Sequence, residues 1–393
     1  MLVVFELPSG ADLSEYLHVA TWKNDVRNEE MDYCQGREKA HEILACRRAG
    51  IPYVVLSKPD FFSVRDGAKE TQIVDTNVNI DALADSTPLV MRALSKMVDA
   101  EALKRFPLFV SAESDNDVLH WLDRVDEKYL KRQMTELTQE QFNDAMRTNN
   151  IATPVFLKGV EKGGGLSLRH VLASDQDLHD LVKTAGELRK IYGSLVPHGA
   201  RDDDYIAFRQ MPDWECPYRG EQKGRAYFFE PKDGVMLSDV LDFKHLPDHK
   251  AEYRCFIVDG RVSSISTYTD YVSYPVPDEI RKIASEFAAE HASIAPAFVA
   301  DFGMTDRGPV LVELNSFAQS GRYVGNDPDA LYRDLEQLLG VDRSNIKEPK
   351  VPVPSIVEDR SLFEFGSKDS GEFATRLMMR KAQKVRQGNM DLG

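Results

Sequence analysis

The chain has 393 residues, of which 42% are hydrophobic and 29% are charged, and its net charge at pH 7 is -15. A chain of this length can form two or three domains with a sizeable core, and the negative charge argues against a general nucleic-acid partner. The four cysteines have no metal-ligand spacing, so we expect free thiols in a reducing compartment. Without a signal-peptide pattern or an apolar run of roughly 20 residues, we expect a cytoplasmic protein with no membrane partner.

The N-terminal part of the chain favours a small α/β domain. We expect a buried strand at residues 2–7, a helix at 29–48 that ends before a glycine, and a second strand at 51–56. Strand, helix and strand in this order are typical of α/β folds. Helical patterns are also expected at residues 87–104 and 114–126.

A lysine followed by a glycine-rich loop lies near the middle of the chain. The strand expected at 155–158 ends in Lys158 and continues as Gly159-Val-Glu-Lys-Gly-Gly-Gly165. Glycines let backbone N–H groups approach phosphates closely, and lysines supply positive charge. A flexible loop with two solvated lysines is the alternative, because the spacing fits neither common phosphate-binding fingerprint. The phosphate-binding candidates are Lys158, Lys162, Gly163, Gly164 and Gly165.

Several helices have clear boundary signals. Thr138 followed by Gln141 predicts a capping box at a helix start. Asp327 followed by Pro328 predicts an N-cap and a proline in the first turn of a helix that closes at Gly340. Further elements expected from their patterns are a helix at 175–192, a strand at 205–209 and an amphipathic helix at 278–291.

An arginine stands on the apolar face of a predicted hairpin at residues 251–265. The pair Asp259-Gly260 predicts a type I′ turn, and strand alternation places Arg254 on the same face as Phe256 and Val258. A guanidinium cannot lose its proton, so its burial requires an anion. That anion is either a bound phosphate or a carboxylate of this chain, and the sequence favours neither.

A second hairpin, at residues 298–315, carries two acids and an amide. A three-residue loop that ends at Gly308, with φ > 0 at the glycine, would place Asp301 opposite Glu313 and Asn315 on the same face as Glu313. Facing carboxylates repel unless a cation lies between them, and such hard oxygen ligands suit Mg²⁺. The alternative is an edge hairpin with a solvated acidic face. Arg322 follows in the next loop.

These signals follow one another in a characteristic order. With Lys158 and its glycine loop, the stretch Glu252-Tyr-Arg-Cys-Phe-Ile-Val-Asp-Gly260, and Asp301 with Glu313-Leu-Asn315, the chain resembles the ATP-grasp superfamily. The resemblance covers about residues 130–340 and is strongest to the phage and bacterial clade named for two arginines and a lysine. It implies an α+β fold in which two α+β subdomains hold ATP between them, preceded by the small α/β domain.

The resemblance also implies domain boundaries. We expect an N-terminal α/β domain at residues 1–130, an ATP-grasp domain at 131–340, and a Pro-containing linker with a basic C-terminal tail at 341–393. The last eighteen residues hold five Lys or Arg against one Asp. Such a tail can act as a docking segment, as an anion-binding arm or simply as a solvated helix.

For the nucleotide, the family pattern implies contacts from three segments. Lys158 would contact the ATP phosphates, and the loop with Lys162 and its three glycines would close over them. The strand that ends near Gln210 and Met211 would hydrogen-bond the adenine.

The family pattern implies five residues that would take part in the reaction or bind the metal. Arg254 would stabilise the transferring phosphoryl group, and Arg322 would bind the substrate carboxylate or an acyl phosphate. One or two Mg²⁺ ions would be held by Asp301, Glu313 and Asn315.

The implied activity is that of an ATP-dependent carboxylate–amine ligase. A carboxylate attacks the γ-phosphate to give an acyl phosphate and ADP, and an amine then displaces phosphate to form an amide. This chemistry needs positioning and charge neutralisation, not a protein nucleophile. The alternatives are a phosphotransferase on the same fold and a non-catalytic nucleotide- or protein-binding module. Substrates would be small-molecule or peptide carboxylates and amines, and the oligomeric state, including a homodimer, stays open.

Overall fold

The structure is a computed structural model of the chain, and it divides into two compact units. The first unit comprises Met1–Asp60, Ala68–Val118 and Phe243–Gly393, and the second comprises Phe61–Gly67 and Leu119–Asp242. Among the helices described, none combines the length and the apolar character needed to cross a membrane. The described residues are 1–8, 13, 17, 33–58, 71–92, 100–110, 121–148, 150–159, 169–172, 174, 235–247, 249–269, 273–323 and 325–341.

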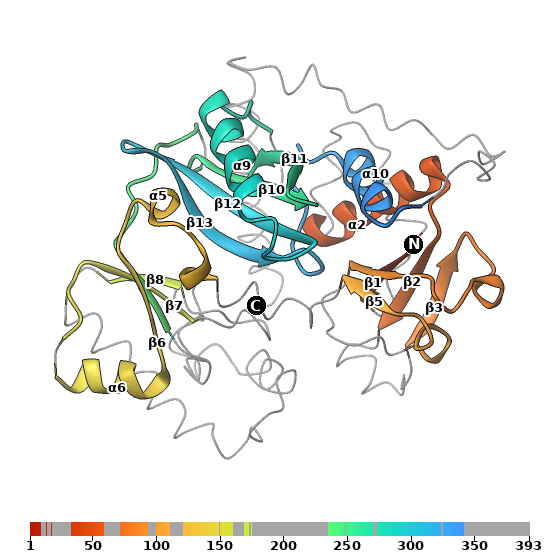
Figure 1. Ribbon diagram of the computed structural model, residues 1–393, viewed down its shortest axis with the longest axis horizontal. Coiled ribbons are helices and arrows are strands. Elements are labelled where there is room, and N and C mark those ends of the chain that lie inside the picture. The colour runs from red at the N-terminus through yellow and green to blue at the C-terminus, as the bar shows by residue number, and fades with distance from the viewer. Residues whose placement is uncertain are drawn as a thin grey trace, which may run out of the picture. The chain divides into compact units, whose positions relative to one another are not determined.

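A five-stranded sheet forms the N-terminal part of the first unit (Figure 1), with the strand order β3-β2-β1-β4-β5. The central strand β1 pairs in parallel with β2 and β4, whereas β3 is antiparallel to β2. Helix α2, Tyr33–Ala49, precedes β2 and contacts β1. The five strands are β1 at Leu2–Pro8, β2 at Tyr53–Lys58, β3 at Gln72–Thr76, β4 at Leu89–Arg92 and β5 at Leu108–Val110.

The α/β pattern predicted for the N-terminus is confirmed, but the two helices predicted after it are wrong over the residues that the structure describes. Within 87–104 the described residues form β4 and a single 3-10 turn, Glu101–Leu103. Within 114–126 they form only the 3-10 turn Leu122–Arg124. All four residues of β4 are buried beside β1, and a short apolar run of a buried parallel strand cannot be told from a helix by periodicity.

A four-stranded antiparallel sheet, ordered β11-β10-β12-β13, carries both predicted hairpins. Asp259 and Gly260 have φ values of 50 and 66, which confirms the type I′ turn. Helix α9, Asp278–Glu290, contacts this sheet, and its Phe287 ring packs edge-on against Phe298 and Phe302. The strands are β10 at Glu252–Val258, β11 at Arg261–Thr267, β12 at Ala297–Thr305 and β13 at Gly308–Ser316.

The β12–β13 hairpin has the predicted pairing of Asp301 with Glu313, but its loop is not the predicted one. Thr305 pairs with Gly308, so the loop is one residue shorter than predicted, although Gly308 does have a positive φ of 89. The register then shifts between Asp301 and Phe302, since Phe302 pairs with Leu311 and Asp301 with Glu313. A bulge on β13 therefore restores the pairing of the two acids that the longer loop was expected to produce.

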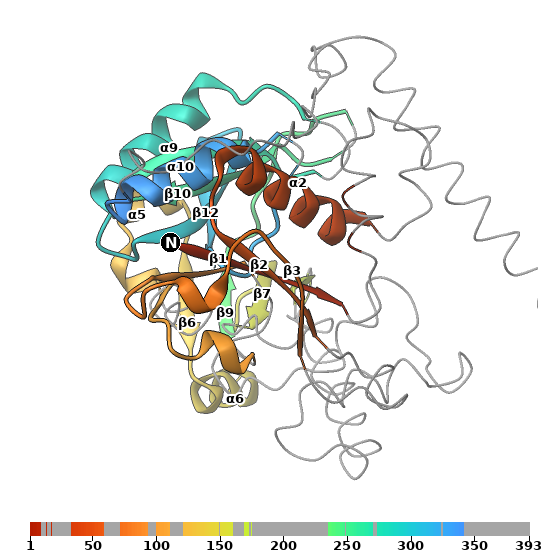
Figure 2. The same ribbon diagram turned by 90° about the vertical axis from the view of Figure 1, so that its right-hand side faces the viewer.

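The two sheets of the first unit share one hydrophobic core. Phe256, Val258 and Val299 of the second sheet belong to the same buried cluster as the strands of the first sheet. Helix α10, Pro328–Leu338, contacts α2 and the strands β10 and β11, and Figures 1 and 2 show α2 and α10 side by side. The predicted division of the chain at residues 130 and 340 stays a prediction, but the N-terminal sheet and the two hairpins are built as one packed body.

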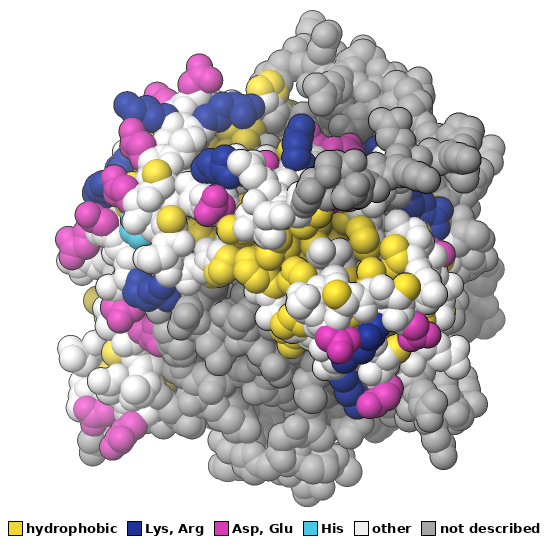
Figure 3. Space-filling view, turned by 45° about the vertical axis from the view of Figure 1, so that its right-hand side comes forward, with side chains coloured by type: hydrophobic (Ala, Val, Ile, Leu, Met, Phe, Trp, Pro, Cys, Tyr) yellow, Lys and Arg dark blue, Asp and Glu magenta, His cyan; other side chains and the backbone are white. Residues whose placement is uncertain are grey.

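Exposed apolar side chains lie on the edge strands of the first sheet. Among the side chains described in this sheet, the exposed large hydrophobic ones are Ile73 and Val74 on β3 and Leu108 on β5. Figure 3 shows hydrophobic side chains gathered in a band on the face that it presents. Sheet edges are where further strands can pair, and the homodimer stays a prediction.

The second unit is a smaller sheet with the order β6-β9-β7-β8. Its core holds Phe142, Leu157 and Val235. The backbone N–H of Thr138 donates to Oε1 of Gln141 at 2.8 Å, and the N–H of Gln141 donates to the Thr138 hydroxyl at 3.2 Å, which confirms the capping box. Its elements are α5 at Glu127–Leu130, β6 at Met134–Leu137, α6 at Gln139–Arg147, β7 at Val155–Gly159, β8 at Arg169–Leu172 and β9 at Val235–Ser238. The helix expected at 175–192 and the strand expected at 205–209 lie outside the described residues.

The predicted N-cap of α10 is confirmed and gives a first testable expectation. The Asp327 carboxylate accepts hydrogen bonds from the N–H groups of Asp329 and Ala330 at 3.0 and 3.1 Å. Asp327→Ala should lower the free energy of unfolding by about 1 kcal/mol, measured by urea denaturation. Gln337→Ala, an exposed change in the last turn, should stay within about 0.5 kcal/mol of the wild type. Equal losses in both variants would show that the cap contributes nothing.

Candidate functional site

Three charged residues lie in a row across the second sheet. Arg254 on β10 pairs with Asp301 on β12, and Asp301 pairs with Glu313 on β13. Directly paired residues of neighbouring strands have their side chains on the same face. Asn315 lies two positions beyond Glu313 and therefore shares that face. The structure thus brings together four of the residues predicted from the two hairpins.

Hydrogen bonds join these four side chains into one network. The Arg254 guanidinium donates from Nε to Oδ1 of Asp301 at 2.9 Å and from Nη2 to Oδ2 at 2.7 Å. The Nδ2 of Asn315 donates to Oδ2 of Asp301 at 2.8 Å and to Oε1 of Glu313 at 3.1 Å. Asp301 is 0% exposed and Glu313 is 3% exposed, so the alternative of a solvated acidic face is wrong.

The partner of Arg254 in this structure is a carboxylate of the chain. The fork-shaped contact with Asp301 is the geometry in which arginine binds carboxylates most strongly. Although burial opposes its charge, Asp301 holds the pKa of Arg254 well above its usual range. Of the two alternatives left open by the sequence, the internal ion pair is present here.

Two tyrosines hold the Arg254 guanidinium, and neither was identified from the sequence. The Arg254 guanidinium carbon lies 4.6 Å from the ring centroid of Tyr268 and 5.0 Å from that of Tyr323, within the range of cation–π attraction. Nη1 of Arg254 also donates to the carbonyl of Gly321 at 3.0 Å. Since Arg254 pairs with Ser266, alternation along the hairpin could have placed Tyr268 on the same side, two positions further on. No pattern in the loop identifies Tyr323.

The donor set fits a magnesium ion in the chemistry of its oxygen ligands. Two carboxylates and one amide converge on one buried face, and hard oxygen ligands are those that Mg²⁺ prefers. The Asn315 amide directs its Nδ2 toward both acids here, so it would have to turn over to present its oxygen to a metal. Both oxygens of Asp301 already accept hydrogen bonds from Arg254, and Oδ2 also accepts one from Asn315, so a metal ion at Asp301 would have to displace at least one of these donors. Among the described residues no group of three or more His, Cys, Asp or Glu gathers around a common metal position, so Asn315 is needed to complete the set.

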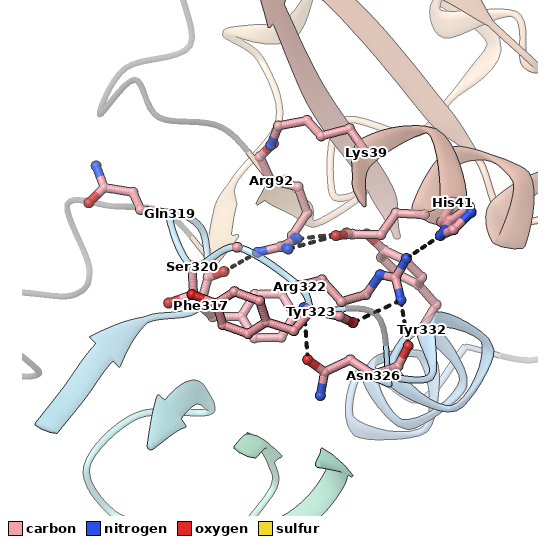
Figure 4. A network of polar contacts seen from close by, with 12 residues as sticks. Lys39, His41, Arg92, Phe317, Gln319, Ser320, Arg322, Tyr323, Asn326 and Tyr332 are labelled. Carbon is pink, nitrogen blue, oxygen red and sulfur yellow. Dashed lines mark hydrogen bonds and ion pairs between the residues drawn. The ribbon is translucent and has the colours of Figure 1, made fainter. Parts of the chain in front are cut away.

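Arg322 has partners inside the protein in the described conformation. Its side chain is 2% exposed, and Nη2 donates to Nδ1 of His41 at 2.7 Å. Nη1 donates to the carbonyl of Asn326 within the same loop (Figure 4). The physical reason is that the loop lies against α2, which supplies His41 as one acceptor, while the loop itself supplies the Asn326 carbonyl. Binding of a substrate carboxylate or an acyl phosphate by Arg322 stays a prediction, and it would require these contacts to be exchanged.

A second buried ion pair, between Glu42 of α2 and Arg92 of β4, lies close to this loop. Arg92 donates to both oxygens of Glu42 at 2.7 Å, and its Nη1 donates to the carbonyl of Phe317, two residues after Asn315 (Figure 4). The Tyr332 hydroxyl of α10 also donates to Glu42. No sequence signal pointed to this pair, because Arg92 fell in a segment that was expected to be helical.

The nucleotide-binding candidates are only partly within the described residues. Lys158 lies on β7 in the second unit, where its backbone pairs with Arg169 and Met236. The remaining candidates lie outside the described residues, and their assignment stays a prediction: Lys162, Gly163, Gly164, Gly165, Gln210 and Met211.

The chain is similar to one described family and to several solved structures. Residues 203–335 match the model of an ATP-grasp domain, family 3 of the clade named for two arginines and a lysine. This segment contains Arg254, Asp301, Glu313 and Asn315. No curated protein matches the chain.

The solved structures that resemble the chain have low sequence identity to it. D-alanine–D-alanine ligase from Bacillus anthracis is 12% identical, with a TM-score of 0.43, over 87% of this chain and 98% of that protein. Phosphoribosylamine–glycine ligase from Thermotoga maritima is 13% identical, with a TM-score of 0.44, over 88% of this chain and 78% of that protein. The ATP-grasp ligase PsnB, solved with a minimal precursor, Mg and ADP, is 12% identical, with a TM-score of 0.37, over 86% of this chain and 98% of that protein.

Proposed function

The chain belongs to the ATP-grasp superfamily through the domain matched at residues 203–335, and from this premise we propose that it is an ATP-dependent carboxylate–amine ligase. It would join a small-molecule or peptide carboxylate to an amine through an acyl phosphate, with release of ADP and phosphate. One observation carries the proposal. The row of Arg254, Asp301 and Glu313, with Asn315 bonded to both acids, is the only part of the described chain where paired buried carboxylates share one face of a sheet.

The proposed role of this row is to handle the charge of a polyphosphate. Glu313, Asp301 and Asn315 would hold Mg²⁺, which when bound neutralises phosphate oxygens and polarises the phosphoryl group. Arg254 presents a planar fork that matches phosphate geometry as well as carboxylate geometry. Burial strengthens each of these contacts, because charges interact more strongly where water is excluded.

The described contacts also orient the charged groups of the site. Tyr268 and Tyr323 fix the plane of the Arg254 guanidinium, and Asn315 holds the two carboxylates at a set spacing. Phosphoryl transfer depends mainly on such positioning of charge and on in-line geometry. Lys158 is proposed to contact the phosphates on the family pattern alone.

Binding of nucleotide is the first consequence that can be measured. A ligand that binds only the folded state adds RT ln(1 + [L]/Kd) to the free energy of unfolding, about 2.7 kcal/mol at 100 times Kd. We therefore expect Mg·ATP to raise the unfolding temperature of the full chain, and adenosine with Mg²⁺, which lacks phosphates, to leave it nearly unchanged. The absence of a shift and of binding heat with Mg·ATP would refute the proposal.

Product analysis separates the ligase from a phosphotransferase with the same site. A ligase releases ADP together with inorganic phosphate only when a carboxylate and an amine are both present. A phosphotransferase releases ADP with a single acceptor and leaves the phosphoryl group on that acceptor. Screening pooled carboxylates with and without pooled amines, with phosphate release as the readout, distinguishes the two.

A further inference from the structure

Asp301 is proposed to hold a metal ion and Arg254 to contact phosphate, but in the structure these two side chains bind each other. Both oxygens of Asp301 are bonded to the Arg254 guanidinium, and the side chains are 6% and 0% exposed. A divalent cation on Asp301 would lie within a few ångströms of this guanidinium. At such distances in a buried site two positive charges repel strongly. The pair as it stands therefore opposes metal binding at Asp301.

The same contact places a positive charge beside two facing carboxylates. Asp301 lies directly opposite Glu313, and two buried carboxylates at this spacing destabilise each other unless a cation is close. Arg254 supplies that cation, and it is held in place by the carbonyl of Gly321 and by the rings of Tyr268 and Tyr323. Arg254 thus acts as the resident counter-ion of Asp301.

We infer that Arg254 and a divalent cation exchange at Asp301, so that metal binding at Asp301 releases the guanidinium to an anionic ligand of the polyphosphate class. The inference rests on the proposed function and adds a regulatory property to the same site. When the metal replaces Arg254 as the counter-ion, the free fork faces an incoming phosphate. When the metal leaves, the guanidinium returns to Asp301. Metal and polyphosphate should therefore bind together far better than the metal binds alone.

The decisive measurement is metal binding without nucleotide. Titration of the full chain with Mn²⁺, followed by calorimetry and by the paramagnetic signal of free Mn²⁺, should give weak binding to the wild type. Arg254→Met removes the competing cation and should bind Mn²⁺ about 10-fold more tightly or better. The same variant should bind Mg·ATP more weakly than the wild type, because the fork for the phosphate is gone.

Matched variants keep the result interpretable. Arg261→Met removes an exposed arginine from the same hairpin and should leave Mn²⁺ binding unchanged. In Arg254→Met/Asp301→Asn the gain in Mn²⁺ affinity should disappear, since the Asp301 carboxylate that would bind the metal is gone. If Arg254→Met does not fold, Arg254→Lys serves instead. Its ammonium lacks the planar fork and competes less well, so an intermediate gain is expected.

The outcomes separate this inference from the proposed function. If Arg254→Met or Arg254→Lys binds Mn²⁺ no more tightly than the wild type, while the wild type binds Mg·ATP, the exchange is refuted and the proposed function stands. If the wild type binds neither Mn²⁺ nor Mg·ATP, the proposed function itself fails. A gain that persists in the Arg254→Met/Asp301→Asn variant would place the metal elsewhere and would also refute the exchange.

Discussion

Glu313→Gln should lower the rate of ATP turnover by about 10²-fold or more while the protein stays folded, the scale expected when one preorganised charge contact to the transition state is lost. The substitution removes a negative charge from the buried row but keeps its shape. Asn315 donates to Oε1 of Glu313, and the amide oxygen of a glutamine can accept the same hydrogen bond. The repulsion between Glu313 and Asp301 also falls, so stability without metal should hold or rise.

The effect on turnover has a matched control in the same hairpin. Asp306 lies at the exposed turn of β12 and β13, so Asp306→Asn removes one carboxylate charge far along the strands from the row. Its ATP turnover should stay close to that of the wild type. Steady-state phosphate release and urea unfolding of both variants check the expectation. Normal turnover in Glu313→Gln would show that Glu313 has no part in the reaction. If this variant unfolds, Glu313 is needed for the fold and its role in the reaction is not supported.

The neighbouring Asp301 is a less suitable target for this purpose. Asp301→Asn breaks the buried ion pair with Arg254 and leaves a guanidinium without its carboxylate. Loss of activity in that variant would then mix an unfolding effect with a catalytic one. The structure, and not the sequence, shows that Asp301 is paired with Arg254 and that Glu313 is therefore the better target.

The largest expected effect on stability belongs to Glu42. Its side chain is 1% exposed and bonds both nitrogens of the Arg92 fork. Glu42→Gln removes the carboxylate charge that neutralises the buried Arg92 guanidinium and should lower the free energy of unfolding by roughly 3–5 kcal/mol. Glu101→Gln, which breaks an exposed pair with Lys104, should cost less than about 1 kcal/mol. Comparable losses of unfolding free energy in the two variants would show that the buried pair stabilises the protein no more than the exposed pair does.

The pH dependence of stability gives an independent test of the Glu42 network. Burial alone would raise the pKa of Glu42, but the nearby cations Arg92, Lys39 and Arg322 lower it from 4.5 to about 2. A carboxylate whose pKa is depressed by folding stabilises the protein above its unfolded pKa, and this contribution is lost as the pH falls through the folded pKa. Wild-type stability should therefore decline between pH 4.5 and about pH 2 more steeply than that of Glu42→Gln. If the stabilities of the wild type and of Glu42→Gln fall equally with pH, the Glu42 carboxylate does not contribute to the pH dependence of stability.

The Glu42 network also connects the N-terminal sheet to the candidate site. Arg92 donates to the carbonyl of Phe317, two residues beyond Asn315, and its guanidinium lies 5.1 Å from the Phe317 ring centroid. The strand that carries Glu313 and Asn315 is thereby fixed at its end by a residue of β4. Disruption of this contact is expected to loosen the amide that joins the two carboxylates.

Local features of the site follow from the sequence alone. The type I′ turn at Asp259-Gly260, the hairpin with Asp301 opposite Glu313, and the cap of α10 at Asp327 are all confirmed. The type I′ turn and the helix cap depend on turn and capping chemistry that acts over a few neighbouring residues. The pairing of Asp301 with Glu313 agrees with the prediction, but it is produced by a two-residue loop and a bulge on β13 that the sequence did not indicate. The family resemblance rests on Lys158 with its glycine loop and on the two hairpins, and the matched residues 203–335 contain the hairpins.

The partner of Arg254 was decided only by the tertiary structure. Arg254 and Asp301 are 47 positions apart, and Glu42 and Arg92 are 50 apart. No local pattern specifies which strand lies beside β10 or which acid faces a buried guanidinium, because that choice depends on how whole sheets pack around a shared core. The same packing made β4 a strand instead of a helix and turned Arg322 toward α2. The sequence by itself therefore determined which residues carry the charge, and the pairing of strands far apart in the chain determined which of them neutralise one another.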